Sequence, residues 1–215
     1  MSILVTGTDT GVGKTTFSVW LVTRLRERGL RCAGYKPICC GDRQDAELLL
    51  AASSSGLTIE EINPLWLRTP AAPLTAAQAE HREIDLASLC DGFVRLKDRM
   101  DVVVVEGVGG WIVPITRDYF SSDLASDLRL PVLVVAQNRL GCLNHTFLTV
   151  RSIAAAGLNC LGVVLNNQAA VADDVAMDTN AGILRQCLTI PVIDKFDPES
   201  TEMPAQLDSM LSRFA

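Results

Sequence analysis

Residues 5–16 read Val5-Thr6-Gly7-Thr8-Asp9-Thr10-Gly11-Val12-Gly13-Lys14-Thr15-Thr16, a glycine-rich turn between two segments of different character. The apolar residues Ile3-Leu4-Val5 predict a short buried strand before it, and the stretch from Phe17 to Arg28 predicts a helix after it. Glycine adopts positive φ and lets the backbone approach a ligand, so successive N–H groups can point into one concavity. That concavity lies at the positive end of the helix dipole, where a polyphosphate is favoured. The order strand, loop, helix therefore predicts a phosphate-binding loop rather than a tight turn without a ligand.

The end of this turn carries side chains suited to a nucleotide and its metal ion. Lys14 is placed to reach the outer phosphates, and the Thr15 hydroxyl to ligate Mg²⁺. The usual loop has a glycine five positions before Gly13, where this chain has Thr8 and a glycine one position earlier. The loop is therefore a variant. Its predicted nucleotide-binding residues are Gly11, Val12, Gly13, Lys14, Thr15 and Thr16.

The composition is that of one globular α/β domain, with 48% hydrophobic residues over 215 positions. The formal net charge of −6 argues against a broad nucleic-acid-binding surface. The seven cysteines form no C-x-x-C pair, which favours free thiols in a reducing cytoplasm over disulfides or zinc. The first strand begins at the N-terminus and no apolar run reaches the length of a membrane span, so we expect neither a signal peptide nor membrane contact. We expect a soluble cytoplasmic protein.

Segments of strand and helix character alternate along the chain. Residues 101–106 are apolar on both faces, as a central parallel strand must be, and the predicted strands 131–136 and 161–166 repeat this pattern. Residues 57–80 are predicted as loops with short helical turns because prolines interrupt them, and a last strand is predicted at 190–193. The alternation predicts a single domain over residues 1–215, a doubly wound, mostly parallel α/β sheet of the P-loop NTPase type with helices on both faces.

Polar side chains follow several predicted strands, at the sheet edge where ligands of such folds bind. Glu106 ends the central strand, where a P-loop protein keeps the acid that binds Mg²⁺; the alternative is a helix-capping or solvated carboxylate. Lys36 ends the second strand and either stabilises charge on a transferred phosphoryl group or lies solvated on the surface. Asp45 begins a helix and either binds the metal or only matches the helix dipole. Asn166 and Asn167 either offer amide groups to a base edge or form an ordinary turn.

Four motifs occur together in an order typical of one enzyme family. They are Gly7-Thr-Asp-Thr-Gly-Val-Gly-Lys-Thr15, Gly34-Tyr-Lys-Pro37, Val105-Glu-Gly-Val-Gly-Gly-Trp111 and Leu140-Gly-Cys-Leu-Asn-His145. With them the chain resembles the dethiobiotin synthetases, ATP-dependent ligases of biotin biosynthesis, from residue 3 to residue 167. The resemblance implies that 7,8-diaminononanoate takes up CO₂ as a carbamate, that ATP phosphorylates the carbamate, and that the second amine closes the ring with release of phosphate.

The same resemblance assigns roles to the polar residues. Lys14 holds the phosphates, and Lys36 binds the carbamate and offsets charge in both steps, so these two are the expected catalytic residues. Thr15, Asp45 and Glu106 are the expected Mg²⁺ ligands. Asn166, with Asn167 beside it, would read the adenine. The expected nucleotide-binding residues beyond the first loop are Asp45, Glu106, Gly107, Val108, Gly109, Asn166 and Asn167.

The family also implies a homodimer with the substrate at its interface. The turn from Leu140 to Asn144 of the second subunit takes the substrate carboxylate at a helix N-terminus, where backbone N–H groups and the helix dipole suit an anion. The chain departs from the family at Cys40, often a serine, at Asn167, an aspartate in some members, and at residues 195–198, which lack the usual closing Gly-x-x-Pro. The expected substrate-binding residues are Lys36, Cys40, Gly109, Leu140, Gly141 and Asn144.

Three other functions share this fold. A partition or division-site ATPase switch carries a lysine five residues before the P-loop lysine, and this chain has Asp9 there. An amidating ligase of cobalamin synthesis has a further glutamine-hydrolysing domain, for which 215 residues leave no room. A kinase for a small acid or amine would leave the segment from Leu140 to His145 without explanation.

Overall fold

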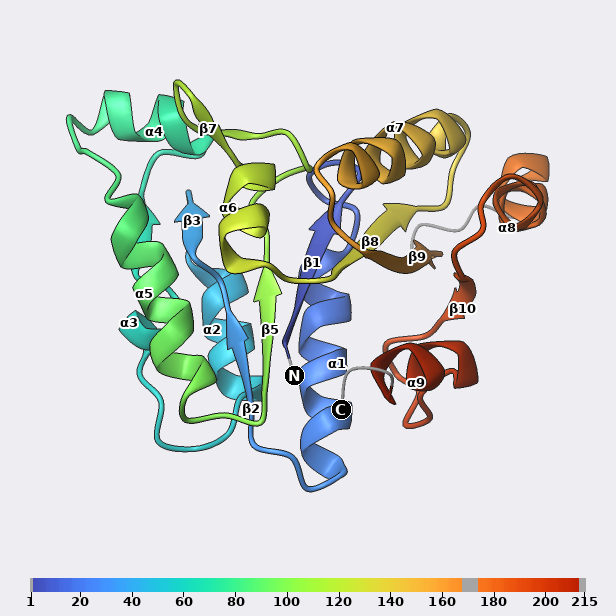
Figure 1. Cartoon of the computed structure of the whole chain (residues 1–215), viewed down its shortest axis with the longest axis horizontal. Coiled ribbons are helices and arrows are strands. Elements are labelled where there is room, and N and C mark those ends of the chain that lie inside the picture. Colours follow the sequence, from blue (N-terminus) through green and yellow to red (C-terminus); the bar gives the residue numbers. More distant parts are fainter. Residues whose placement is uncertain (1, 168–173, 213–215) are drawn as a thin grey trace.

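A parallel six-stranded sheet forms the centre of the computed structural model, which describes residues 2–167 and 174–212. Its strands lie in the order β10-β9-β8-β1-β5-β2, and every neighbouring pair is parallel. They are β1 (Ser2–Gly7), β2 (Cys32–Tyr35), β5 (Val102–Glu106), β8 (Val132–Gln137), β9 (Cys160–Asn166) and β10 (Val192–Phe196). Because β5 and β8 flank β1, the carboxyl ends of these three strands lie together at the loop that follows β1 (Figure 1).

Helices cover both faces of the sheet (Figure 1). In β1, Ile3 and Val5 belong to the apolar cluster that contains α1 residues, whereas Leu4 belongs to the cluster that contains residues of α5, α6 and α7. This alternation follows from the two-residue period of a strand, and it confirms the predicted doubly wound α/β fold. Within the described ranges, no helix is long and apolar enough to cross a membrane. The helices are α1 (Lys14–Glu27), α2 (Gln44–Ala52), α3 (Ile59–Ile62), α4 (Pro73–Ala79), α5 (Leu86–Lys97), α6 (Ser121–Leu128), α7 (Cys142–Ala155), α8 (Val175–Cys187) and α9 (Ala205–Ser212).

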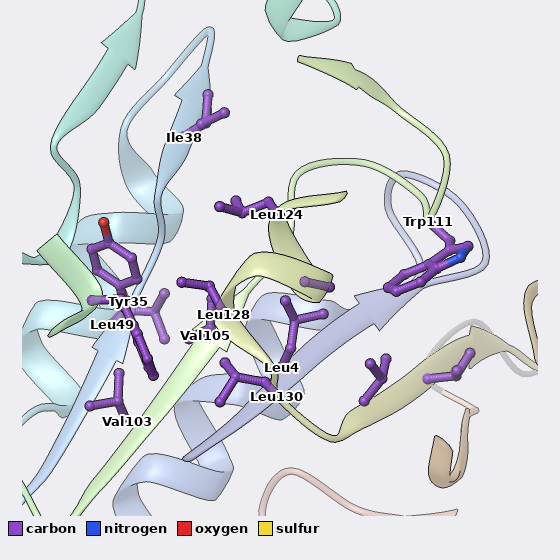
Figure 2. Close-up of a cluster of buried hydrophobic side chains, with 14 of the residues drawn as sticks. Leu4, Tyr35, Ile38, Leu49, Val103, Val105, Trp111, Leu124, Leu128 and Leu130 are labelled. Carbon is purple, nitrogen blue, oxygen red and sulfur yellow. The ribbon is translucent and has the colours of Figure 1, made fainter. Parts of the chain in front are cut away.

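The larger of the two apolar clusters packs against the strands whose ends carry the polar residues predicted from the sequence. In Figure 2, Leu124 and Leu128 of α6 lie over Leu4 and Val105 of the two central strands. Burying one such side chain contributes about 1.5–3 kcal/mol, so this packing fixes the strand ends from which the polar residues project.

Residues 57–80 contain more regular structure than the sequence predicts. The short strand β4 (Leu65–Leu67) pairs in parallel with β3 (Ile38–Cys40), which follows β2. Pro73 begins α4 instead of interrupting it, since the first position of a helix needs no N–H donor. The hairpin of β6 (Pro114–Thr116) and β7 (Tyr119–Phe120) was likewise not predicted.

The last strand is shifted from its predicted position. β10 begins at Val192 because Pro191 has no N–H to donate, and the Pro191 carbonyl accepts a hydrogen bond from Val163 N at 3.0 Å. The strand continues to Phe196, whose ring centroid lies 5.2 Å from that of Phe17 and 5.4 Å from that of Trp20. These aromatic contacts with α1 hold the edge strand against the phosphate-loop helix.

Candidate functional site

The loop between β1 and α1 leads into the N-terminus of α1. Gly11 and Gly13 have φ angles of 74° and 96°, in the left-handed region that strains any residue with a side chain. Gly13 is also the N-cap of α1, and a Cβ there would lie 2.1 Å from Nδ2 of Asn166. Since glycine has no side chain to cap the helix, the first N–H groups of α1 are left to bind an anion.

A cavity of about 850 Å³ opens beside this loop. Its volume is that of a typical small-molecule site. It brings together the following residues predicted from the sequence: Gly11, Gly13, Lys14, Thr15, Thr16, Lys36, Cys40, Asp45, Val108, Gly109 and Asn166. The wall also includes residues that the sequence did not single out: Thr10, Ile38, Cys39, Asp42, Gln44, residues 70–73, Val113 and Gln137.

Four polar side chains from separate elements meet at the floor of this cavity. Thr15, Lys36 and Asp45 line it, and Glu106 is buried against them. Lys36 Nζ donates to Asp45 Oδ2 at 2.9 Å and to Glu106 Oε1 at 2.5 Å. Thr15 Oγ1 lies 2.8 Å from Asp45 Oδ1 and 2.8 Å from Glu106 Oε1. Because a hydroxyl has one hydrogen, Thr15 can donate to only one of these carboxylates at a time. Lys36 also contacts the carbonyl of Gly107 at 3.3 Å, which ties this cluster to the glycine loop after β5.

Lys36 and Glu106 at the floor are deeply buried, so their charges exist only because they are paired. Glu106 is 0% exposed and Lys36 is 3% exposed. An isolated charge at such depth would be strongly unfavourable. The register of the sheet explains the meeting, because Val5 of β1 lies beside Glu106 and Tyr35, just before Lys36, lies beside Val105.

The two lysines of the site respond differently to burial. Burial lowers the pKa of Lys14 from 10.5 to about 8, and the nearby charge of Lys36 adds to this shift. Burial also disfavours the charged form of Lys36, but Glu106 and Asp45 outweigh it and raise the pKa of Lys36 above its ordinary value. For Asp45, burial raises the pKa, and its ion pair with Lys36 outweighs burial and lowers it. Lys36 is therefore a fixed cation at neutral pH.

Thr15, Asp45 and Glu106 offer the oxygen ligands that Mg²⁺ prefers. In nucleotide sites Mg²⁺ takes one or two carboxylates together with phosphate oxygens and water. Glu106 Oε2 is buried and has no hydrogen-bond partner among the described residues, so one oxygen of this carboxylate is left for a ligand. Residues 2–167 and 174–212 contain no group of three or more His, Cys, Asp or Glu able to hold a metal by themselves. The donor set therefore fits a metal that is shared with a nucleotide.

The two asparagines predicted to read the base occupy different positions. Asn166 lines the cavity, and its Nδ2 donates to the carbonyl of Val12 in the phosphate loop at 3.0 Å. Asn167 instead accepts a hydrogen bond from Asn138 at 2.8 Å and donates to the carbonyl of Asp194 at 2.7 Å. Sequence reasoning missed Asn138, although the polar pair Gln137-Asn138 stands at the end of β8 just as Asn166-Asn167 stands at the end of β9.

The predicted carboxylate-binding turn lies apart from this cavity. Leu140 is 79% exposed, Gly141 has a φ of 90° and is the N-cap of α7, and Asn144 is exposed. In the described part of the chain, none of these three lines the cavity that contains Lys36. One chain therefore does not unite the predicted substrate residues.

Cys40, predicted from the sequence to contact the substrate, is half-buried in the wall of the cavity. Burial raises the pKa of its thiol to about 11, so it is a neutral group at physiological pH. The thiol is a weaker hydrogen-bond donor than the hydroxyl of a serine.

Solved structures with low identity support the fold. The cell division ATPase MinD of Pyrococcus furiosus is 18% identical, with a TM-score of 0.60 over 100% of both chains. The septum site-determining protein MinD of Pyrococcus horikoshii, complexed with Mg-ADP, is 16% identical, with a TM-score of 0.57 over 89% of this chain and 79% of that chain. At such identity they show that this chain has a P-loop NTPase fold and carry no information on its activity.

Relatives of higher identity define the family. A family model described as an AAA domain matches residues 1–201. The ATP-dependent dethiobiotin synthetase BioD of Akkermansia muciniphila is 45% identical over 194 residues, which cover 89% of this chain and 90% of the relative. The enzyme of the same name from Bacillus licheniformis is 35% identical over 214 residues, covering 96% of this chain and 90% of the relative. These matches confirm the resemblance, and the chain belongs to the family of ATP-dependent dethiobiotin synthetases.

Proposed function

We propose that this protein closes the ureido ring of dethiobiotin from 7,8-diaminononanoate, CO₂ and ATP. The observation that carries the proposal is the position of Lys36, a buried cation within hydrogen-bond distance of both Asp45 and Glu106 and close enough to Lys14 to lower its pKa. A site that only hydrolyses a nucleotide needs cations around the phosphates. Lys36 is a second fixed cation beside the proposed metal ligands. It suits a phosphoryl acceptor that is itself an anion, as a carbamate is.

The chemistry proceeds in three balanced steps. One amine of the substrate attacks CO₂ and loses a proton, which gives a carbamate. A carbamate oxygen then attacks the γ-phosphorus of ATP, and ADP leaves. Finally the second amine attacks the carbonyl carbon, a C–N bond forms, and phosphate leaves as the amine loses its proton.

Each step places negative charge where this chain holds positive charge. Lys14 would bind the β- and γ-phosphate oxygens at the N-terminus of α1, and Lys36 would bind the carbamate and then the departing phosphate. Thr15, Asp45 and Glu106 would hold Mg²⁺, which when bound supplies neutralising charge at the phosphates. Asn166 would present its side chain to the adenine, with Asn167 beside it in the chain.

A homodimer would complete the substrate site. Leu140, Gly141 and Asn144 lie outside the cavity of their own chain, and the turn at the N-terminus of α7 suits a carboxylate. Leu140 in the turn is 79% exposed and Leu148 in α7 is 59% exposed, which fits an apolar surface covered by a second subunit.

The cytoplasm is the proposed location. The seven cysteines are free thiols, as expected for a protein of the reducing cytoplasm. The 215 residues would act as one catalytic domain.

Product analysis tests the proposal. The protein is incubated with ATP, MgCl₂, ¹³C-bicarbonate and 7,8-diaminononanoate, and the products are identified by mass spectrometry. We expect dethiobiotin with one ¹³C atom in its ureido carbonyl. A phosphorylated diamine as the only product would instead identify a small-molecule kinase, and ADP without any modified diamine would identify an ATPase switch.

A further inference from the structure

Three asparagine side chains form a linked cluster behind the base end of the cavity. Asn138 follows β8, Asn167 follows β9, and Asn180 lies on α8. Asn180 Nδ2 donates to Asn138 Oδ1 at 2.9 Å, and Asn138 Nδ2 donates to Asn167 Oδ1 at 2.8 Å. Asn138 is 6% exposed and Asn180 is 3% exposed, so water does not replace these hydrogen bonds easily. The nucleotide chemistry described above assigns no role to Asn138 or Asn180.

Backbone carbonyls fix the orientation of every amide in this cluster. Asn180 Nδ2 also donates to Arg139 O at 3.2 Å, Asn138 Nδ2 to Met177 O at 2.9 Å, and Asn167 Nδ2 to Asp194 O at 2.7 Å. A carbonyl oxygen can only accept, so each amide must turn its NH₂ group toward its carbonyl. The oxygens of Asn138 and Asn167 thereby face the NH₂ groups of Asn180 and Asn138. No amide in the series can flip alone without losing a hydrogen bond.

The cluster connects two places that the proposed reaction uses. At one end, Asn138 N donates to Asn166 O at 2.9 Å, and Asn166 reaches the phosphate loop through Val12. At the other end, Asn180 holds Arg139 O, immediately before the Leu140–Gly141 turn that caps α7. A displacement of Asn166 therefore changes hydrogen bonds that also position the Leu140–Gly141 turn.

We infer that Asn138 and Asn180 are positioning residues that couple the nucleotide base site to the turn before α7, so that a nucleotide and a substrate carboxylate strengthen each other's binding. The inference rests on the proposed function, because it uses the base and carboxylate sites assigned there. Coupling of this kind is reciprocal: the factor by which the substrate tightens nucleotide binding equals the factor by which the nucleotide tightens substrate binding. In a dimer, nucleotide binding to one subunit would thereby change the affinity of the other subunit's substrate site for its substrate.

Calorimetric titration of the full-length protein tests the coupling. A non-hydrolysable ATP analogue with Mg²⁺ is titrated with and without saturating 7,8-diaminononanoate, for the wild type, Asn138→Asp and Asn180→Leu. Asn138→Asp keeps the shape but replaces the donor to Asn167 with a carboxylate oxygen. Loss of buried hydrogen bonds predicts that both variants bind the analogue about tenfold more weakly. The coupling factor, above one in the wild type, should fall to one in both, while kcat at saturating substrates changes little. Thr179→Ala is the matched control, since Thr179 is exposed beside Asn180 and its hydroxyl donates to Val175 O within α8.

Three results would overturn the inference. One is a wild-type coupling factor of one. Another is a variant that unfolds at a lower temperature but keeps both the wild-type affinity and the wild-type coupling factor, which would make the asparagines purely structural. The third is an equal loss of coupling in Thr179→Ala. Failure of the proposed function is a different observation: wild-type protein that binds the analogue but forms no dethiobiotin.

Discussion

Under the proposed function the cavity has a phosphate end and a base end, and the two are built by opposite means. At the phosphate end, Lys36, Asp45 and Glu106 are charged, and Lys36 and Glu106 are almost completely buried. At the base end, Asn138 and Asn180 are equally buried but neutral, and backbone carbonyls hold them in place. Both ends lie at the carboxyl edge of one parallel sheet, so the fold alone does not cause the difference.

The difference follows from what each end has to do. Charge that develops during phosphoryl transfer is stabilised by fixed opposite charge in a site that excludes water. A heterocyclic base carries no net charge, so its recognition depends on donors and acceptors held at fixed angles. We therefore expect changes at the phosphate end to act mainly on the rate of reaction, and changes at the base end to act mainly on nucleotide affinity.

Removal of Lys36 should produce the largest effect. In Lys36→Ala, kcat for ring closure should fall by about 10³-fold or more, since a charge at the reacting group is lost. Nucleotide binding should persist, because Lys14 and the loop remain. The kcat is measured from dethiobiotin formed and the affinity by calorimetry. Lys97→Ala is the control, since Lys97 is an exposed lysine outside the cavity. Normal turnover of Lys36→Ala would show that the charged floor does not act on the reaction.

Neutralising the buried carboxylate should have the next largest effect. Glu106→Gln keeps the shape but removes the negative charge that faces Lys36 and the proposed Mg²⁺. The kcat should therefore fall by about 10²-fold, and half-maximal activity should need more Mg²⁺. Activity is measured across a series of MgCl₂ concentrations. Glu83→Gln, at an exposed glutamate, is the matched change and should leave the Mg²⁺ curve in place. An unaltered curve in Glu106→Gln would remove Glu106 from the metal site.

The contact between the two ends should give a smaller effect. Gly13→Ala places a methyl group 2.1 Å from Asn166 Nδ2, so the Asn166 side chain must move. We expect nucleotide affinity to fall about tenfold, and the free energy of unfolding to fall by about 1–2 kcal/mol from the positive φ alone. Gly29→Ala separates the two causes, because Gly29 has a φ of 85° but nothing within 4 Å of its Cβ position. The two ends would act independently if both variants kept wild-type affinity.

The smallest change is expected at the cavity wall. Cys40→Ser replaces a weak donor with a hydroxyl, and one better hydrogen bond predicts a KM for the diamine that is lower by about two- to fivefold. Initial rates at varied diamine concentrations give the KM. Cys187→Ser changes an exposed cysteine in the same way and should leave the KM unaltered. If Cys40→Ser raised the KM, the thiol would be a better neighbour for the substrate than the hydroxyl.

The sequence predicts the phosphate end much better than the base end. Lys14, Thr15 and Glu106 stand directly at a glycine loop or at the end of an apolar strand, and their charge marks them as unusual there. Lys36 and Asp45 needed the family resemblance to rise above ordinary surface charges. The structure joins Thr15, Lys36, Asp45 and Glu106 in one hydrogen-bonded cluster. Lys14 lies close enough for their charges to shift its pKa.

The base end is harder to predict because neutral amides are common in turns and helix faces. Nothing in the residues around Asn180 distinguishes it from a solvated helical asparagine, and its partner Asn138 is 42 positions away. Likewise, β4 has three residues and pairs with β3 across an irregular segment, so no periodic pattern could identify it. Hydrogen bonds between neutral side chains, or between short strands, that are far apart in the chain form only in the folded state. Local sequence patterns therefore do not predict them.

The most direct test of the central claim is the ratio of ADP to dethiobiotin released by wild-type protein. ADP release is followed with ATP, Mg²⁺ and bicarbonate, first without and then with 7,8-diaminononanoate, while dethiobiotin is measured in the same samples. The account predicts almost no ADP without the diamine, and one ADP for each dethiobiotin with it. ADP release at the same rate in both conditions would contradict it, because the charged floor would then act on ATP hydrolysis rather than on a carbamylated amine.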